Sequence, residues 1–152
     1  MKIAIGCDEA AYDMKEGVKA LLVRLGHEID DKGVYDETPV VYADIAVSVA
    51  SEIASGAARR GILLCGTGIG MAITANKVPG VRAAVCHDPL STERARKSND
   101  AQIMCIGARI ISRQLAEYLV ELWLTCEFAD GASTAKVERI MEYERKFRNG
   151  GN

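Results

Sequence analysis

The sequence predicts an α/β fold in which a parallel sheet of about five strands is covered by helices on both faces. Short apolar segments alternate along the chain with longer segments whose apolar residues recur at helical spacing. Glycine-rich or polar turns follow several of the short segments. This alternation implies right-handed crossovers between parallel strands, and such sheets bind ligands beyond the carboxyl ends of their strands.

The first half of the chain is expected to hold two strands and two helices. Residues 1–7 form an apolar strand, and the amphipathic helix after them ends at Gly26, a typical helix-terminating residue. A weak strand follows over residues 27–31. A second amphipathic helix begins near Tyr42 and is closed by Gly56.

The second half continues the alternation. A strand over residues 61–64 runs into a glycine-rich turn and a helix. Asp88 and Pro89 supply an N-cap and a first-turn proline for a helix that reaches Lys97. The remaining expected elements are strands over 81–86 and 103–106 and helices over 115–126 and 137–147. The sparse apolar stripe of the last helix suits capping the monomer or, as we favour, packing against a second subunit.

Length and composition predict one globular domain. The chain has 152 residues, of which 49% are hydrophobic and 26% are charged, so it is long enough for a sizeable core. We expect a single domain over residues 1–148 and a flexible tail over residues 149–152. The net charge of -2 and the scattered basic residues indicate no nucleic-acid partner.

Cysteine and histidine usage narrows the class of protein further. The five cysteines form no CxxC pair and are odd in number, so we expect reduced thiols and a cytoplasmic protein. No apolar run approaches the roughly 20 residues of a membrane span. His27 and His87 do not form a ligand-spaced pair, so we expect no metal site.

The most informative segment is GILLCGTGIGMAITANK, residues 61–77, which predicts a strand, an anion-binding turn and a helix. Its glycines allow a ligand to approach the backbone closely, and the helix that follows offers unpaired N–H groups. Cys65 ends the strand and Thr67 adds a hydroxyl, so the turn suits a proton-transfer base beside a transient oxyanion. A tight connection that follows a core cysteine would explain the same pattern.

Polar residues follow other strands of the predicted sheet as well. Residues 7–9, 65–70, 87–88 and 107–109 each lie at the expected carboxyl end of a strand. Because the carboxyl ends of parallel strands share one edge of a sheet, these four segments are expected to form a common rim and one pocket.

Three segments carry a resemblance to a known family. KIAIGCD, GILLCGTGIGMAITANKVPGVRAAVCHD and SNDAQIMCIGARI occur in this order, and together they resemble the ribose-5-phosphate isomerase B and galactose-6-phosphate isomerase family over nearly the whole chain. The resemblance implies a Rossmann-like three-layer sandwich that assembles as a homodimer or a dimer of dimers. It also implies interconversion of aldose and ketose phosphates through a cis-enediol, without metal or organic cofactor.

The resemblance implies roles for particular residues. Cys65 matches the family's catalytic base, and Thr67 would move protons between substrate hydroxyls. Asp8 matches an aspartate that contacts the sugar, although it could also be only a helix N-cap. Asn99 and Tyr42 match residues near the substrate, with a loop residue and a core residue as the respective alternatives. The loop residues expected to bind the enediolate through backbone N–H groups are Gly66, Gly68, Ile69 and Gly70.

The chain also departs from this family. Ser98 and Glu9 stand where many ribose-5-phosphate isomerases have histidines, one of which assists opening of the furanose ring. Lys136 stands where many members have a phosphate-binding arginine, which leaves Arg109 and Lys136 as the expected phosphate contacts, and a lysine binds phosphate as a point charge. His87, on the same predicted rim, is a candidate for the missing ring-opening acid and for substrate binding.

These departures bear on the substrate. Ribose 5-phosphate closes a furanose through its C4 hydroxyl, whereas a tetrose 4-phosphate has that hydroxyl esterified and needs no ring-opening acid. Ser98 therefore favours a tetrose-phosphate isomerase as an alternative to a ribose 5-phosphate/ribulose 5-phosphate isomerase. A non-catalytic module that binds sugar phosphate through the same loop is the other alternative. The loop lacks the glycine spacing of a dinucleotide site and the Gly-Lys-Ser/Thr of a P-loop.

Overall fold

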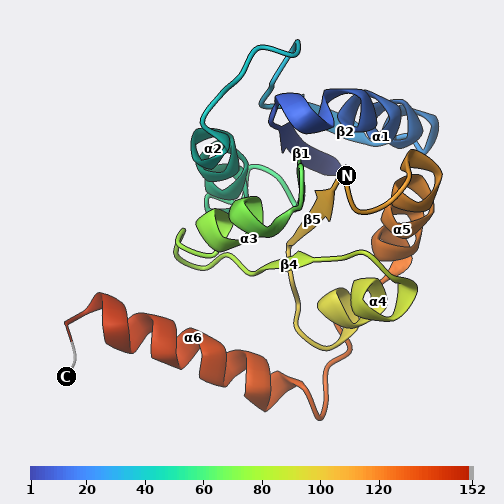
Figure 1. Ribbon diagram of the computed structural model, residues 1–152. Helices are drawn as coiled ribbons and strands as arrows, with labels where there is room; N and C mark the ends of the chain where they lie inside the picture. Colours follow the sequence, from blue (N-terminus) through green and yellow to red (C-terminus); the bar gives the residue numbers. More distant parts are fainter. Residues whose placement is uncertain (151–152) are drawn as a thin grey trace.

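The computed structural model describes residues 1–150 and has the expected α/β architecture (Figure 1). Five parallel strands form one sheet in the order β2-β1-β3-β5-β4. The strands are β1 Lys2–Cys7, β2 Glu28–Asp31, β3 Arg60–Cys65, β4 Ala83–Val85 and β5 Ile103–Gly107. Cys65 is in register with Gly107 of the neighbouring strand, so the ends of β3 and β5 lie side by side.

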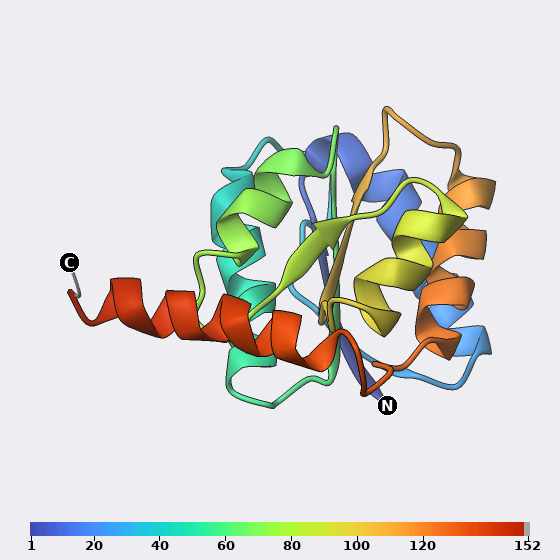
Figure 2. The same cartoon turned by 90° about the horizontal axis from the view of Figure 1, so that it is seen from below.

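Helices cover both faces of this sheet, as predicted (Figure 2). The helices are α1 Tyr12–Arg24, α2 Tyr42–Ala54, α3 Ile69–Ala75, α4 Pro89–Lys97, α5 Arg113–Thr125 and α6 Thr134–Arg148, with a short 3-10 helix η1 Glu9–Ala11. Helices α1, α4 and α5 lie on one face, and α2 and α3 lie on the other. Within residues 1–150, no helix combines the length and hydrophobicity needed to cross a bilayer.

The central strand β3 is buried on both faces, which explains its continuous apolar run. Successive side chains point to opposite faces of a strand, so Ile62 and Leu64 join the core on the α1 and α5 side. Leu63 and Cys65 join the second core, against α2 and α3. This alternation places the Cys65 side chain on the same face as helix α3, at the carboxyl end of the sheet.

Side-chain caps begin three of the helices. Asp88 Oδ1 accepts from Ser91 N at 2.8 Å, with Pro89 in the first turn, which confirms the predicted N-cap of α4. Ser112 Oγ accepts from Leu115 N at 3.2 Å at the start of α5. Asp8 Oδ1 accepts from Ala10 N at 3.1 Å, so the N-cap role suggested for this residue is present.

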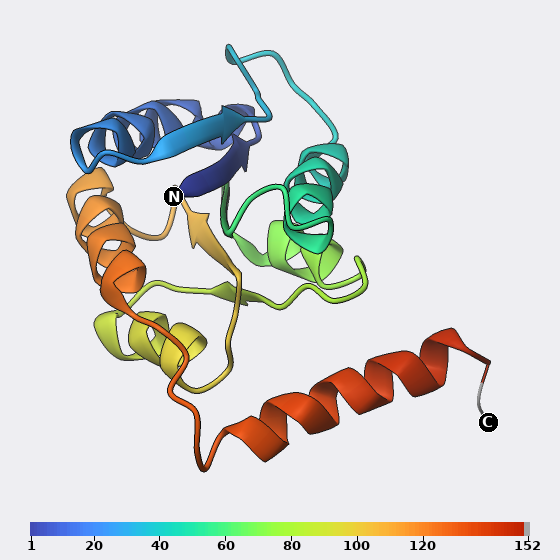
Figure 3. The ribbon, with the colours of Figure 1, turned by 180° about the vertical axis from the view of Figure 1, so that it is seen from behind.

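Helix α6 extends away from the other elements (Figure 3). Val137 is its buried residue, while Ile140, Tyr143 and Phe147 expose 48%, 49% and 71% of their surfaces. The helix ends at Arg148, and residues 151 and 152 of the expected tail lie outside the described residues.

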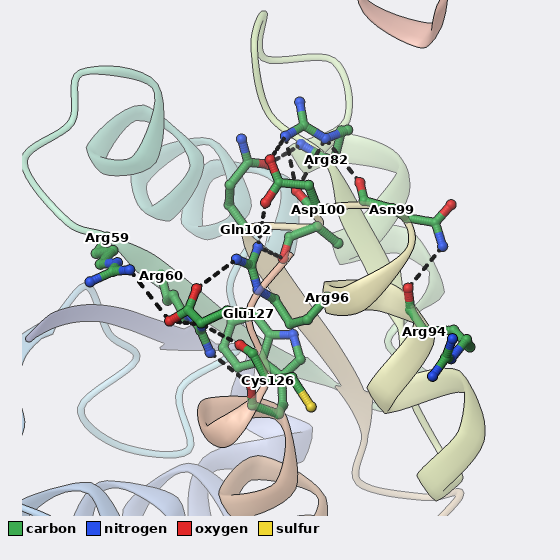
Figure 4. A network of polar contacts seen from close by, with 12 residues as sticks. Arg59, Arg60, Arg82, Arg94, Arg96, Asn99, Asp100, Gln102, Cys126 and Glu127 are labelled. Atoms are coloured by element: carbon green, nitrogen blue, oxygen red, sulfur yellow. Dashed lines mark hydrogen bonds and ion pairs between the residues drawn. The ribbon is translucent and has the colours of Figure 1, made fainter. Parts of the chain in front are cut away.

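A network of arginines and carboxylates connects the end of α5 to the amino end of β3 through hydrogen bonds and ion pairs (Figure 4). Arg60 is 1% exposed and donates to Trp123 O at 2.7 Å and to Cys126 O at 2.5 Å. It also pairs with Glu127 at 2.9 Å. The guanidinium therefore supplies a donor to Cys126 O, which follows the last turn of α5, and a second donor to Trp123 O, which also accepts from Cys126 N at 3.2 Å.

Replacing Arg60 by methionine should destabilise the protein by about 2–4 kcal/mol, because two buried hydrogen bonds are lost and the Cys126 carbonyl is left without its donor. Arg59→Met is the matched control, since Arg59 also pairs with Glu127 but its side chain is 65% exposed. Its effect should stay within about 0.5 kcal/mol. Urea unfolding of both variants measures the difference, and equal losses would contradict the importance of the buried contacts.

Candidate active site

Three of the four segments expected to form a common rim line one pocket, and residues 87–88 do not line it. Segments that follow β1, β3 and β5 converge there with the start of α2, and the cavity has a volume of about 420 Å³. This volume is typical of small-molecule sites. The pocket is lined by Asp8, Tyr42, Cys65, Gly66, Thr67, Ile69, Gly70, Ile73 and Arg109.

Cys65 lines this pocket and exposes only 5% of its surface to solvent. Its Sγ accepts a hydrogen bond from the Gly68 amide, with an N to S distance of 3.0 Å. Gly68 has a φ of 77°, in the left-handed region that glycine adopts without strain. The turn thus folds the backbone back over the sulfur, an arrangement in which an amide dipole stabilises a thiolate.

The loop also presents backbone donors to the pocket. The amides of Gly66, Thr67 and Gly70 make no hydrogen bond to another residue within 1–150, so they are available to a ligand. The Thr67 side chain is exposed beside them, and its Oγ1 is 3.4 Å from Ile69 N. The amides of Gly68 and Ile69, which were also expected to bind an oxyanion, are bonded instead to Cys65 Sγ and Thr67 Oγ1. The thiol, the hydroxyl and the remaining free amides lie at one pocket, an arrangement suited to an oxyanion.

Tyr42 forms a wall of the pocket. A Cβ on Gly70 would lie 2.6 Å from its ring, so the glycine allows the ring to pack directly on the loop. The residue is 43% exposed, which is incompatible with the alternative of a core tyrosine. Ile73, which sequence reasoning missed, also lines the pocket, and its spacing of four residues from Ile69 was the available signal.

Asp8 and Arg109 bring opposite charges to the rim. Burial raises the pKa of the Asp8 carboxyl and the charge of Glu9 raises it further, while the Ala10 amide and the Arg109 guanidinium act in the opposite direction. The Arg109 side chain lies over Gly66, 3.5 Å from the position of a Cβ there. Asp8 can therefore exchange a proton or bind a hydroxyl, and Arg109 can bind an anion.

The Glu9 side chain helps to position the pocket by binding a backbone amide of another segment. Its Oε2 accepts from Val40 N at 3.2 Å, which ties the end of β1 to the segment that enters α2. Tyr42 follows two residues later, at the first position of that helix. The Glu9 carboxylate thus helps to place one wall of the pocket.

Four expected site residues do not line the pocket of a single chain. Gly68 lies within the loop, where its amide donates to Cys65 Sγ. His87 lies on the rim, but its Nε2 accepts from Gly107 N at 2.8 Å. Asn99 lies beyond the opposite end of β5, roughly 16 Å away along five residues of strand, where its Nδ2 donates to Arg94 O at 3.0 Å (Figure 4). Lys136 is exposed in the first turn of α6.

The arrangement is suited to proton transfer with stabilisation of negative charge on oxygen. Cys65 can accept a proton from carbon, while the free amides can hold the oxygen on which charge develops. Within the described part of the chain, no three His, Cys, Asp or Glu side chains gather as metal ligands.

Comparison with known proteins connects this geometry to a family. The family model described as ribose/galactose isomerase matches residues 3–140. A Listeria innocua protein named ribose-5-P isomerase B is 50% identical over 148 residues, which are 97% of this chain and all of that protein. A Pectobacterium atrosepticum protein named D-erythrulose-4-phosphate isomerase is 49% identical over 96% of this chain and 97% of its own length.

A solved structure has the same fold as well. The Clostridium thermocellum ribose-5-phosphate isomerase B superimposes with a TM-score of 0.95 and 41% identity. The match covers 97% of this chain and 99% of that one, so the likeness extends over the sheet, its helices and the rim.

Proposed function

The chain belongs to the ribose/galactose isomerase family, and on that basis we propose that it is an aldose–ketose isomerase of a small sugar phosphate. The observation that carries the proposal is the Cys65 thiol, 3.0 Å from the Gly68 amide and next to unpaired loop donors in a pocket of sugar size.

In the proposed reaction, Cys65 takes the proton from C2 of the aldose as the enediolate forms. The amides of Gly66, Thr67 and Gly70 bind the oxygen that carries the developing charge. The Thr67 hydroxyl moves a proton between the two substrate oxygens, and Cys65 returns its proton to C1. The substrate gains and loses the same number of protons and electrons, so the isomerisation requires no external oxidant or reductant.

The remaining rim residues would bind the sugar phosphate. Asp8 is placed to accept a hydrogen bond from a sugar hydroxyl, and Tyr42 covers the substrate from the side of α2. Arg109 is the phosphate contact that one chain supplies at the pocket. Asn99 and Lys136 would act in the pocket of a second copy, because both lie away from the pocket of their own chain.

A homodimer, or a dimer of dimers, would allow Asn99 and Lys136 of one copy to act in the pocket of another. Helix α6 and the turn before β4 enclose a groove of about 580 Å³ whose walls include Pro79, Val81, Ile140, Met141 and Phe147. The apolar side chains of α6 would pack there against a second copy. The five cysteines are all unpaired, which supports the proposed cytoplasmic location.

A four-carbon substrate is the second candidate. The two relatives of nearly equal identity are named for a five-carbon and a four-carbon sugar phosphate, so identity alone does not choose between them. Ser98 is the C-cap of helix α4, and its Oγ is 3.5 Å from the Arg94 guanidinium. It supplies a hydroxyl where the sequence resemblance leads us to expect an imidazole. The absence of a ring-opening acid at this position favours the tetrose phosphate.

Cys65→Ala should lower kcat by about 100- to 10,000-fold, because it removes the proposed base. Cys126→Ala is the control, since Cys126 is also buried but lies at the end of α5, and it should retain wild-type kcat. Steady-state assays and thermal unfolding of both variants separate catalysis from folding. Wild-type turnover by Cys65→Ala would exclude the thiol as the base.

The substrate is tested by comparing erythrose 4-phosphate, ribose 5-phosphate, allose 6-phosphate and galactose 6-phosphate under the same conditions. Ser98 predicts the highest kcat/KM with erythrose 4-phosphate, and Ser98→His should raise kcat/KM selectively for ribose 5-phosphate. Comparable kcat/KM on the four- and five-carbon sugars, with no selective gain in Ser98→His, would remove the argument for a tetrose substrate.

A shared site predicts complementation between two inactive variants. Cys65→Ala and Asn99→Ala homodimers should each be impaired, whereas random re-association of equal amounts should restore about a quarter of the wild-type sites. Activity after mixing, together with sedimentation analysis, checks this expectation. Impairment of both homodimers without any recovery in confirmed mixed dimers would show that the two residues do not meet across the interface.

A further inference from the structure

The edge strand β4 leaves the sheet next to the active site. Val85 is paired with Cys105, and the Cys86 amide donates to Cys105 O at 3.0 Å. In a regular parallel ladder the next bond would join the Gly107 amide to the carbonyl of Cys86. The His87 side chain takes that place instead, because its Nε2 accepts the Gly107 N–H at 2.8 Å.

Gly107 lies directly against the loop that carries Cys65. A Cβ on Gly107 would come within 2.7 Å of the carbonyl carbon of Thr67. The two residues after Gly107 are bonded to the same loop, with Ala108 N 2.8 Å from Cys65 O and Arg109 N 3.0 Å from Gly66 O. The turn over residues 107–109 therefore packs against the Cys65 loop and is hydrogen-bonded to it. The His87 ring binds the same turn through the Gly107 amide.

This contact defines the state of the imidazole. A ring nitrogen that accepts an N–H is unprotonated, so the proton of the neutral ring is on Nδ1. Burial lowers the pKa of His87, with the neighbouring Asp88 acting in the opposite direction, which is consistent with a neutral ring. The Nε2 atom is thus committed to the backbone and has no proton to give to a sugar oxygen.

We propose that His87 is a positioning residue for the isomerase reaction, which acts through the Gly107 backbone and not as the ring-opening acid. This inference rests on the proposed function. Loss of the acceptor leaves the Gly107 amide without a partner and releases the turn on which Gly66 and Thr67 rest. A displacement of about 1 Å in the amides that face the substrate is enough to slow the chemical step on the order of 100-fold.

Three variants separate an acceptor role from an acid role. His87→Gln places an amide oxygen near the position of Nε2, so it can accept the Gly107 N–H but cannot serve as an imidazole acid. His87→Asn carries the same amide group on a shorter side chain that reaches only the position of Nδ1, and His87→Ala removes the group. The glutamine and asparagine variants are therefore a matched pair that differ in reach.

The measurements are kcat and KM with erythrose 4-phosphate and ribose 5-phosphate, together with amide hydrogen exchange of the wild type and each variant. We expect His87→Ala and His87→Asn to lose about 10- to 100-fold in kcat by similar factors on every sugar that the wild type turns over, with little change in KM. His87→Gln should recover most of kcat. Amide hydrogen exchange over residues 105–109 should be faster in His87→Ala and His87→Asn than in the wild type, and unchanged in His87→Gln.

Several results would overturn the proposal. A glutamine variant as slow as the alanine variant, or a loss confined to ribose 5-phosphate, would identify an acid. Unchanged kcat and unchanged exchange in His87→Ala would show that the contact does not position the loop. A wild-type protein that turns over none of the sugars would refute the proposed function instead, and exchange would still decide whether His87 supports the turn.

Discussion

The close packing of two backbone segments, the loop after β3 and the turn after β5, is the constraint on which the site depends. The register of Cys65 with Gly107 brings these segments together at one edge of the sheet. Gly68 and Gly107 then approach the opposite backbone so closely that a Cβ would lie 3.0 Å from Ile106 and 2.7 Å from Thr67, respectively. The amide that reaches the sulfur and the amides left free for a ligand both result from this packing.

The elements around this contact hold it from several directions. Tyr42 packs on the loop from α2, and Glu9 ties the approach to that helix to the end of β1. His87 supports the turn from the edge strand. At the far end of the sheet, Arg60 secures the helix that follows β5. In the proposed account, these contacts leave the thiol and the loop amides in a fixed arrangement, so that little reorganisation is needed when charge develops on the substrate.

Much of the fold could be predicted because its signals are local. The apolar run of β3, the helical spacing of α2 and the Asp88-Pro89 start of α4 each depend on neighbouring residues only. Three of the four rim segments could be predicted as well, since the carboxyl ends of parallel strands share one edge. The bond of Glu9 to Val40 and that of His87 to Gly107 could not, because they join residues whose distance depends on loop geometry. The positions of Asn99 and Lys136 outside the pocket could not be predicted either, because matching a motif does not show where the chain places its residues in space.

Proton transfer by Cys65 through an enediolate is best tested by following an isotope on the reacting carbon. An aldose phosphate carrying deuterium at C2 is converted in ordinary water, and the ketose product is examined by NMR and mass spectrometry. We expect at least part of the label to be lost to solvent and replaced by protium at C1, and we expect Cys65→Ala to stop both exchange and turnover. Complete transfer of the deuterium from C2 to C1, with the same outcome in the alanine variant, would show hydride migration without the thiol and would exclude Cys65 as the base.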